Sequence, residues 1–251
     1  MSYKNFLGVY AGQEQKKDWY KMFAKVEGKS NVAMLEIYDV ITPWGVNDLI
    51  SQIKAMNADE IRVFINSPGG DVFSGMALSN ALKSSNSKIK TYVTGLAASA
   101  ASVIAMAGQE IIIYENSYIM CHCAWSMSIG SAEELLATVN ILEKLDNTIV
   151  DIYAKKTGKD KGEILSMMKA ETWFNSAEAH AYGLVDLVLK DENAKGAMAF
   201  DLSAYASTPE ILMNITNKEL MAKVKAELEE DLEAKKRKQM LKRLALVEVE
   251  I

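Results

Sequence analysis

The stretch Gly95-Leu96-Ala97-Ala98-Ser99-Ala100-Ala101-Ser102 places Ser99 among small, uncharged residues. An alternating, strand-like segment at 88–93 precedes it, and an apolar run at 103–107, suited to a buried helix, follows it. We therefore expect Ser99 at the start of a helix, beside free backbone N–H groups and the positive end of the helix dipole. That position favours a nucleophile that forms an oxyanion-bearing acyl intermediate. A serine that only caps the helix has the same local sequence, so this stretch leaves both interpretations open.

Length, composition and charge bound the class of protein. A chain of 251 residues that is 49% hydrophobic can bury a sizeable core, most simply as one domain with an appendage. A net charge of −5 counts against a general nucleic-acid binder. No apolar run is long enough to cross a bilayer, and the N-terminus lacks the apolar region of a secretory signal. We expect a cytoplasmic protein without a membrane partner.

The cysteines do not indicate a metal site. Cys121 and Cys123 flank His122 in a strand-like run, so the two thiols point to the face opposite the imidazole. Two cysteines at this spacing are no disulfide framework, and His180 is the only other histidine. A zinc site needs further ligands at suitable spacing, so we expect no metal and no cofactor.

The order of elements predicts an α/β fold. Strand-like runs alternate with helical periodicity, which is typical of parallel sheets built from βαβ units. Strands are expected at 32–38, 60–65, 88–93, 110–114, 117–122 and 184–189, and helices include 44–56 and a long one at 131–156 with a capping box at Ser131. Residues 1–31 are expected to form an arm or short hairpin, 32–190 the domain, 191–217 a linker and 218–251 a charged helical tail. For the tail we favour a solvated, partly self-associating helix over a nucleic-acid-binding one.

Acyl transfer by a serine needs a base, an orienting acid and oxyanion donors. His122 ends a strand, and open α/β sheets place their sites at strand ends. His180 falls in a short predicted helix and is expected to be a surface or packing residue. The turn Ser67-Pro68-Gly69-Gly70 follows a strand, and the missing Cβ of a glycine allows a backbone N–H to approach a substrate oxygen. The same turn also fits ordinary punctuation between a strand and a helix.

Four segments in this order resemble the proteolytic subunit of the Clp protease (ClpP) family of serine peptidases. They are Ile65-Asn66-Ser67-Pro68-Gly69-Gly70, Gly95-Leu96-Ala97-Ala98-Ser99, Asn116-Ser117-Tyr118-Ile119-Met120-Cys121-His122 and Ala177-Glu178-Ala179-His180-Ala181-Tyr182-Gly183-Leu184-Val185-Asp186. The resemblance spans about 32–189. It implies the ClpP/crotonase fold, with repeated ββα units and a long handle helix, here 131–156, that mediates contact between rings.

The resemblance also implies roles for single residues. Ser99 corresponds to the nucleophile and His122 to the general base, and the oxyanion-hole N–H groups correspond to Gly70 and Ala100. Ser102, one turn further, is a rival nucleophile whose expected role is packing or a helix-internal hydrogen bond. The family's aspartate falls on Glu171, a departure that keeps an acceptor for the imidazole N–H but lengthens its arm. Asp160 is a second acidic candidate, placed too far upstream for the alignment.

The partners follow from the same resemblance. It implies a polypeptide substrate and a homo-oligomeric ring, heptamer or tetradecamer. Residues 1–31 do not match the gating segment of members fed by a Clp ATPase, and the charged tail is unlike theirs. The chain is most similar to phage and prophage ClpP-like proteases that mature capsid or scaffold proteins, with an ATPase-partnered Clp protease as the alternative.

Three other functions stay open. A crotonase-type acyl-CoA enzyme shares the fold but explains neither Ser99 nor His122. A signal-peptide-peptidase relative needs a lysine at the site and usually a membrane anchor, and no anchor is visible. A structural ring protein of a head-assembly complex with a degenerate site is kept open by Glu171.

Overall fold

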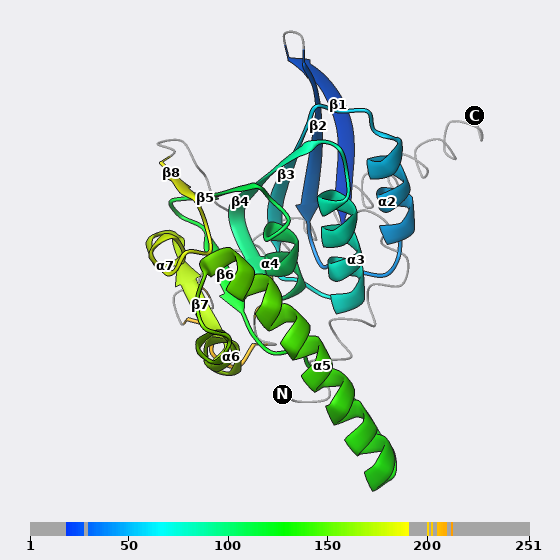
Figure 1. Ribbon diagram of the computed structural model, residues 1–251, viewed down its shortest axis with the longest axis vertical. Coiled ribbons are helices and arrows are strands. Elements are labelled where there is room, and N and C mark those ends of the chain that lie inside the picture. The colour runs from blue at the N-terminus through cyan, green and yellow to red at the C-terminus, as the bar shows by residue number, and fades with distance from the viewer. Residues whose placement is uncertain are drawn as a thin grey trace, which may run out of the picture.

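A mixed sheet lies at the centre of the residues that the computed structural model describes, which are 19–27, 30–190, 200, 202, 205–209 and 212 (Figure 1). Its eight strands run in the order β1-β2-β3-β4-β5-β8, and β6 joins by pairing with β4 and β7. The β1–β2 and β6–β7 pairs are antiparallel, and the other pairs are parallel. The strands are β1 (Tyr20–Glu27), β2 (Ser30–Tyr38), β3 (Glu60–Ser67), β4 (Lys88–Ala98), β5 (Glu110–Tyr114), β6 (Tyr118–Cys121), β7 (Thr172–Asn175) and β8 (Leu187–Leu189).

Helices follow the strands in repeated units, so the expected α/β fold is confirmed. The helices are α2 (Val46–Ala55), α3 (Val72–Lys83), α4 (Ala100–Ala105), α5 (Ala132–Thr157), α6 (Lys161–Lys169) and α7 (Ser176–Tyr182). In Figure 1, α2, α3 and α4 lie beside one another along the sheet. The parallel arrangement brings the carboxyl ends of β3, β4 and β6 to one edge, where an active site is expected in such sheets.

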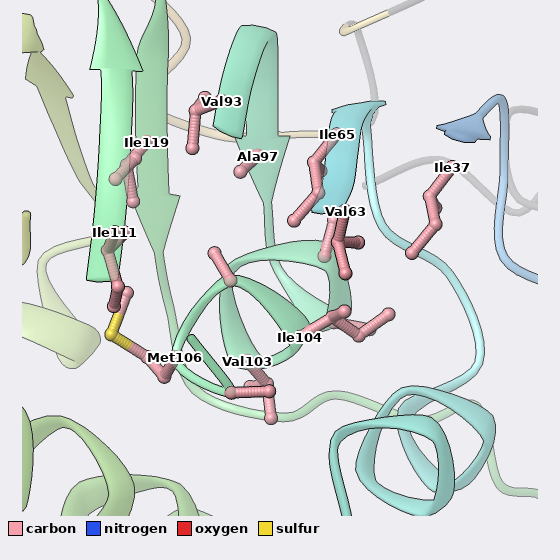
Figure 2. Packing of buried hydrophobic residues seen from close by; sticks show 14 of the residues in the cluster. Ile37, Val63, Ile65, Val93, Ala97, Val103, Ile104, Met106, Ile111 and Ile119 are labelled. Atoms are coloured by element: carbon pink, nitrogen blue, oxygen red, sulfur yellow. The ribbon is translucent and has the colours of Figure 1, made fainter. Parts of the chain in front are cut away.

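The core forms between the sheet and the helices, and α4 lies within it. Along β3, buried residues alternate with half-buried ones, which is the period of a strand with one covered face. All six residues of α4 are buried, because the helix packs against the sheet and is also in contact with α3 and α5. Figure 2 shows side chains of the strands gathered around Val103 and Ile104 of α4. This packing fixes the position of α4, and therefore of the residue that precedes it.

Helix α5 projects from the body (Figure 1). Ser131 and Glu134 form the expected capping box at its start, and Gly158, in the left-handed conformation, ends it. The buried residues of α5 are Ile149, Val150 and Tyr153, all in its C-terminal half. Its N-terminal half carries large exposed apolar side chains, at Leu135, Leu136, Val139 and Ile141.

Both ends of the chain include described residues that pack on the domain. Strand β1 lies within the range expected to form an arm or short hairpin and pairs antiparallel with β2, and Trp19 just before it is only 2% exposed. The linker range 191–217 includes a segment that packs on the domain, which we call the docked segment: Phe200, Leu202, residues 205–209 and Leu212. It packs there because contact between its apolar side chains and an apolar surface of the domain removes both from water. Residues 1–18 and the tail at 218–251 lie outside the described residues. Among the described residues, no helix combines the length and apolar character that a membrane crossing requires.

Candidate active site

Ser99 occupies the junction between β4 and α4 in an unusual backbone conformation. Its φ of 53° and ψ of −124° lie in a region that costs a side-chain-bearing residue about 1–3 kcal/mol. The Ser99 side chain makes no capping hydrogen bond to the helix. Its backbone N–H instead donates to the Met120 carbonyl at 3.0 Å, which ties the junction to β6. The hydroxyl is thus available to groups outside the helix.

Two buried side chains, Ser102 of α4 and Tyr153 of α5, stabilise this junction. The Ser102 hydroxyl donates to the Ser99 carbonyl oxygen at 2.5 Å and lies 2.7 Å from the Tyr153 hydroxyl of α5. Ser102 is fully buried, and it is absent from the lining of the cleft described below. These contacts match the helix-internal hydrogen bond expected for Ser102 and connect α5 to the backbone of Ser99.

His122 follows the last residue of β6, and the parallel pairing of β4 with β6 brings it to Ser99. The His122 Nε2 and the Ser99 Oγ lie 2.8 Å apart, within hydrogen-bond distance. Burial lowers the pKa of His122 below its ordinary value, and the negative charges of Glu171 and Asp146 counteract part of that shift. A neutral imidazole next to a serine hydroxyl is the arrangement that a general base requires.

The glycine turn after β3 lies against the serine junction. The Ser67 hydroxyl donates to the Asp39 carbonyl at 2.6 Å and accepts the Gly69 N–H at 3.1 Å. Gly69 and Gly70 have φ of 93° and 141°, which favour glycine. A Cβ on Gly69 would lie 2.7 Å from the Ser99 Cβ. In the described part of the chain, no hydrogen bond uses the N–H of Gly70 or of Ala100, so both are available as oxyanion donors.

Glu171 lies near His122 but is engaged elsewhere. Its carboxylate accepts the backbone N–H of Ala206 at 3.1 Å and of Ser207 at 2.6 Å. Its own backbone has a φ of 49°, unusual for a residue with a side chain. Among the described residues, no hydrogen bond joins Glu171 to His122, although the carboxylate influences the pKa of the imidazole.

The remaining candidates lie away from this group. Asp160 caps α6, where its carboxylate accepts the Gly162 N–H, and His180 is exposed on α7. Burial raises the pKa of the Cys121 and Cys123 thiols to about 12, so neither is a reactive thiolate. Among the described residues, no cluster of His, Cys, Asp and Glu side chains could hold a metal ion.

Two residues at the site had no signal in the sequence. Asp146, on α5, accepts the Ala124 N–H at 2.7 Å and adds negative charge near His122. Tyr205 of the docked segment packs edge-on against His122, with ring centroids 5.5 Å apart. Neither lies in a recognisable motif, and both reach the site only through the tertiary fold.

A cleft of about 740 Å³ opens beside Ser99 and His122. The glycine turn forms one wall and α5 another, and most of the lining is apolar. Trp125, Met127, Ile141, Leu142 and Leu145 contribute to that lining. The cleft is therefore suited to an apolar side chain held next to the serine.

The chain is similar to known proteolytic subunits. The family model described as Clp protease matches residues 11–192. The ATP-dependent Clp protease proteolytic subunit of Pleurastrum terricola is 28% identical over 186 residues, which cover 71% of this chain and 93% of that protein. The chloroplastic ATP-dependent Clp protease proteolytic subunit 1 of Arabidopsis thaliana is 35% identical over 149 residues, 57% of this chain and 76% of that protein.

Solved structures support the same fold. A ClpP1 mutant from Listeria monocytogenes superposes with a TM-score of 0.57 at 24% identity, covering 63% of this chain and 92% of the other. The family match includes the serine junction, the glycine turn and the histidine strand. Since that match extends over most of the sequence, the chain belongs to the Clp protease family of serine peptidases.

Proposed function

We propose that this chain is a serine endopeptidase that acts through Ser99, His122 and Glu171. The observation that carries the proposal is the 2.8 Å separation of the Ser99 Oγ and the His122 Nε2 at the edge of an apolar cleft. A serine that served only as a helix cap would direct its hydroxyl to the backbone of α4. The side chain instead faces a histidine whose pKa is lowered by burial.

The reaction follows from these positions. The Ser99 Oγ attacks the carbonyl carbon of the scissile peptide as its proton passes to the His122 Nε2. The oxyanion accepts hydrogen bonds from the N–H groups of Gly70 and Ala100. The C–N bond then breaks, and the amine leaves with the proton from His122. Water, deprotonated by the same imidazole, hydrolyses the ester and restores Ser99.

Glu171 has the role of the orienting acid in this proposal. A carboxylate that accepts the second imidazole N–H holds the ring in the required tautomer and stabilises the imidazolium. The electrostatic influence of Glu171 on His122 supports this role. Among the described residues that hydrogen bond is not formed, and the carboxylate accepts the N–H groups of Ala206 and Ser207.

We further propose that the active form is a homo-oligomeric ring. The exposed apolar side chains on the N-terminal half of α5 support a contact between copies, since a solvated helix rarely presents several together. By family resemblance the ring is a heptamer or tetradecamer, and α5 is its handle.

The proposed substrates are capsid or scaffold polypeptides of a phage or prophage. The long segment beyond residue 192, where the family match ends, supports this subtype. A second candidate is a protease that depends on a Clp ATPase, because the relatives named above are described as ATP-dependent. Cleavage of an unfolded protein with and without an added Clp ATPase separates the two.

The experiment that tests the peptidase activity is cleavage of an internally quenched peptide library by the full chain. Ser99→Ala is expected to abolish cleavage, whereas Ser51→Ala, which removes an exposed hydroxyl of α2, is expected to preserve it. Mass spectrometry of the products should show cleavage after apolar residues. Equal cleavage by Ser99→Ala and the wild type would overturn the proposal.

A further inference from the structure

The docked segment covers a specific surface beside the active site. Leu202 and Leu212 are only 1% and 3% exposed, and they pack in one apolar cluster with Leu96, Ala98 and Met120. Those three residues belong to β4 and β6, the strands that carry Ser99 and His122. The chain beyond the peptidase domain is thus anchored on the strands of the site.

Tyr205 connects this anchor to the reacting groups. Its hydroxyl donates a hydrogen bond to the Pro68 carbonyl of the glycine turn. Its ring packs edge-on against His122, and also against Trp173 with centroids 5.8 Å apart. Tyr205 lines the same cleft as Ser99, so it occupies space next to the nucleophile.

The neighbouring backbone binds the triad acid. One carboxylate oxygen of Glu171 accepts the Ala206 N–H and the other accepts the Ser207 N–H. Hydrogen bonds to an ionised acceptor are stronger than those between neutral groups. They fix the carboxylate toward the docked segment, and in the described structure it is not hydrogen-bonded to His122.

We propose that the docked segment is an intramolecular inhibitor, which binds Glu171 and covers His122 until it is released. The inference rests on the proposed peptidase function, because it assigns a regulator to that site. Release frees the carboxylate to orient the imidazole and opens the cleft beside Ser99. Because the segment is part of the same chain, its high effective concentration keeps it bound through a small set of contacts. The Trp173 indole N–H, buried under the segment and unpaired among the described residues, makes the closed form easier to open.

Substitutions in the full chain test this mechanism. Leu212→Asp places a charge in the apolar anchor, and Tyr205→Ala removes the ring from His122 and the hydrogen bond to Pro68. Ser207→Ala is the matched control, since the residue is exposed and contributes its backbone N–H, which alanine retains. Tyr205→Ala also serves where Leu212→Asp reduces folding, because Tyr205 is only half-buried.

The measurements are the rate of fluorophosphonate labelling of Ser99 and deuterium uptake by 205–209. The two variants that release the docked segment, Leu212→Asp and Tyr205→Ala, are expected to label at least about tenfold faster than the wild type, because an oriented acid raises the rate of serine proteases by up to about 10⁴-fold. Deuterium uptake at 205–209 should rise in Leu212→Asp, and the control should match the wild type. As the pH is lowered, labelling of Leu212→Asp and Tyr205→Ala should begin to slow at a higher pH than labelling of the wild type, because a carboxylate closer to His122 raises the imidazole pKa.

The outcomes separate the two proposals. Labelling of the release variants at or below the wild-type rate would overturn inhibition and show that the segment supports the site or is inert. Deuterium uptake that is already maximal in the wild type would equally overturn it, since the segment would not be docked. Absence of labelling in the wild type and in every variant would instead count against the peptidase function itself.

Discussion

Gly69→Ala tests how closely the glycine turn is fitted to the serine junction. Gly69 has a φ of 93°, and a Cβ built there would lie 2.6 Å from the Ala98 carbonyl oxygen and 2.7 Å from the Ser99 Cβ. Both distances are shorter than carbon contacts in folded proteins allow. The clash involves the main chain and a Cβ, so no rotamer change relieves it, and the turn or the junction has to move.

The expected loss of stability in Gly69→Ala has two parts. The left-handed backbone costs alanine roughly 1–2 kcal/mol relative to glycine, and forced repacking adds about 1–3 kcal/mol. A displacement near 1 Å at the nucleophile lowers its reactivity on the order of 100-fold. Gly158→Ala is the control, because Gly158 also has a positive φ, of 71°, but nothing lies within 4 Å of its Cβ position. Gly158→Ala should lose only the stability that the left-handed backbone costs alanine, and it should retain its activity.

Urea unfolding measures the loss of stability, and the rate of fluorophosphonate labelling measures the loss of reactivity. Gly69→Ala should unfold at a lower urea concentration than Gly158→Ala and should label about 100-fold more slowly. Gly158→Ala should label at the wild-type rate. If Gly69→Ala labels as fast as Gly158→Ala, the turn is not fitted to Ser99 and its assignment as an oxyanion donor loses its basis.

Three further sets of changes test the general base His122, the hydrogen bonds of Ser102 and the contact between copies through α5. Burial lowers the pKa of His122, so the labelling rate of Ser99 should have its pH midpoint below the ordinary value of 6.5, and a midpoint above that value would contradict this. Between the lowered pKa of His122 and its ordinary value, the unfolded protein binds a proton on the imidazole that the folded protein does not. The free energy of unfolding should therefore fall as the pH falls, and His122→Gln should reduce this dependence in urea titrations. Ser102→Ala removes the hydrogen bonds to the Ser99 carbonyl and to the buried Tyr153 hydroxyl and should cost about 1–3 kcal/mol of unfolding free energy, with an unchanged urea midpoint as the contrary result. Leu136→Asp combined with Val139→Asp charges the exposed apolar part of α5 and should yield smaller assemblies in sedimentation velocity, whereas an unchanged sedimentation coefficient would argue against this contact.

Local signals in the sequence predicted the elements that carry strong periodicity. The helix expected at 44–56 forms as α2 at Val46–Ala55, and the capping box at Ser131 begins α5. The proximity of Ser99 and His122 was predictable for a topological reason, because both follow strands that end at one edge of a parallel sheet. These features depend on neighbours in the chain or on simple pairing rules.

Other features depend on contacts that no local pattern records. Strand β1 is mostly exposed and is held by pairing with β2 rather than by a buried face, so residues 1–31 were predicted only as an arm or a short hairpin. The contacts of Glu171 with Ala206 and Ser207 join residues that are 35 and 36 positions apart. The range 191–217 is rich in small and polar residues, which indicate a linker, and the apolar side chains of the docked segment bind only after the sheet has formed its surface.

The central claim is that Ser99 is the nucleophile of this peptidase. Its most direct test is peptide mapping by mass spectrometry after reaction of the full chain with a fluorophosphonate. The account predicts one covalent adduct on the peptide that contains Ser99, and no adduct in Ser99→Ala that retains the wild-type far-ultraviolet circular dichroism spectrum. An undiminished adduct in Ser99→Ala, or an adduct that maps to Ser102, would contradict the account.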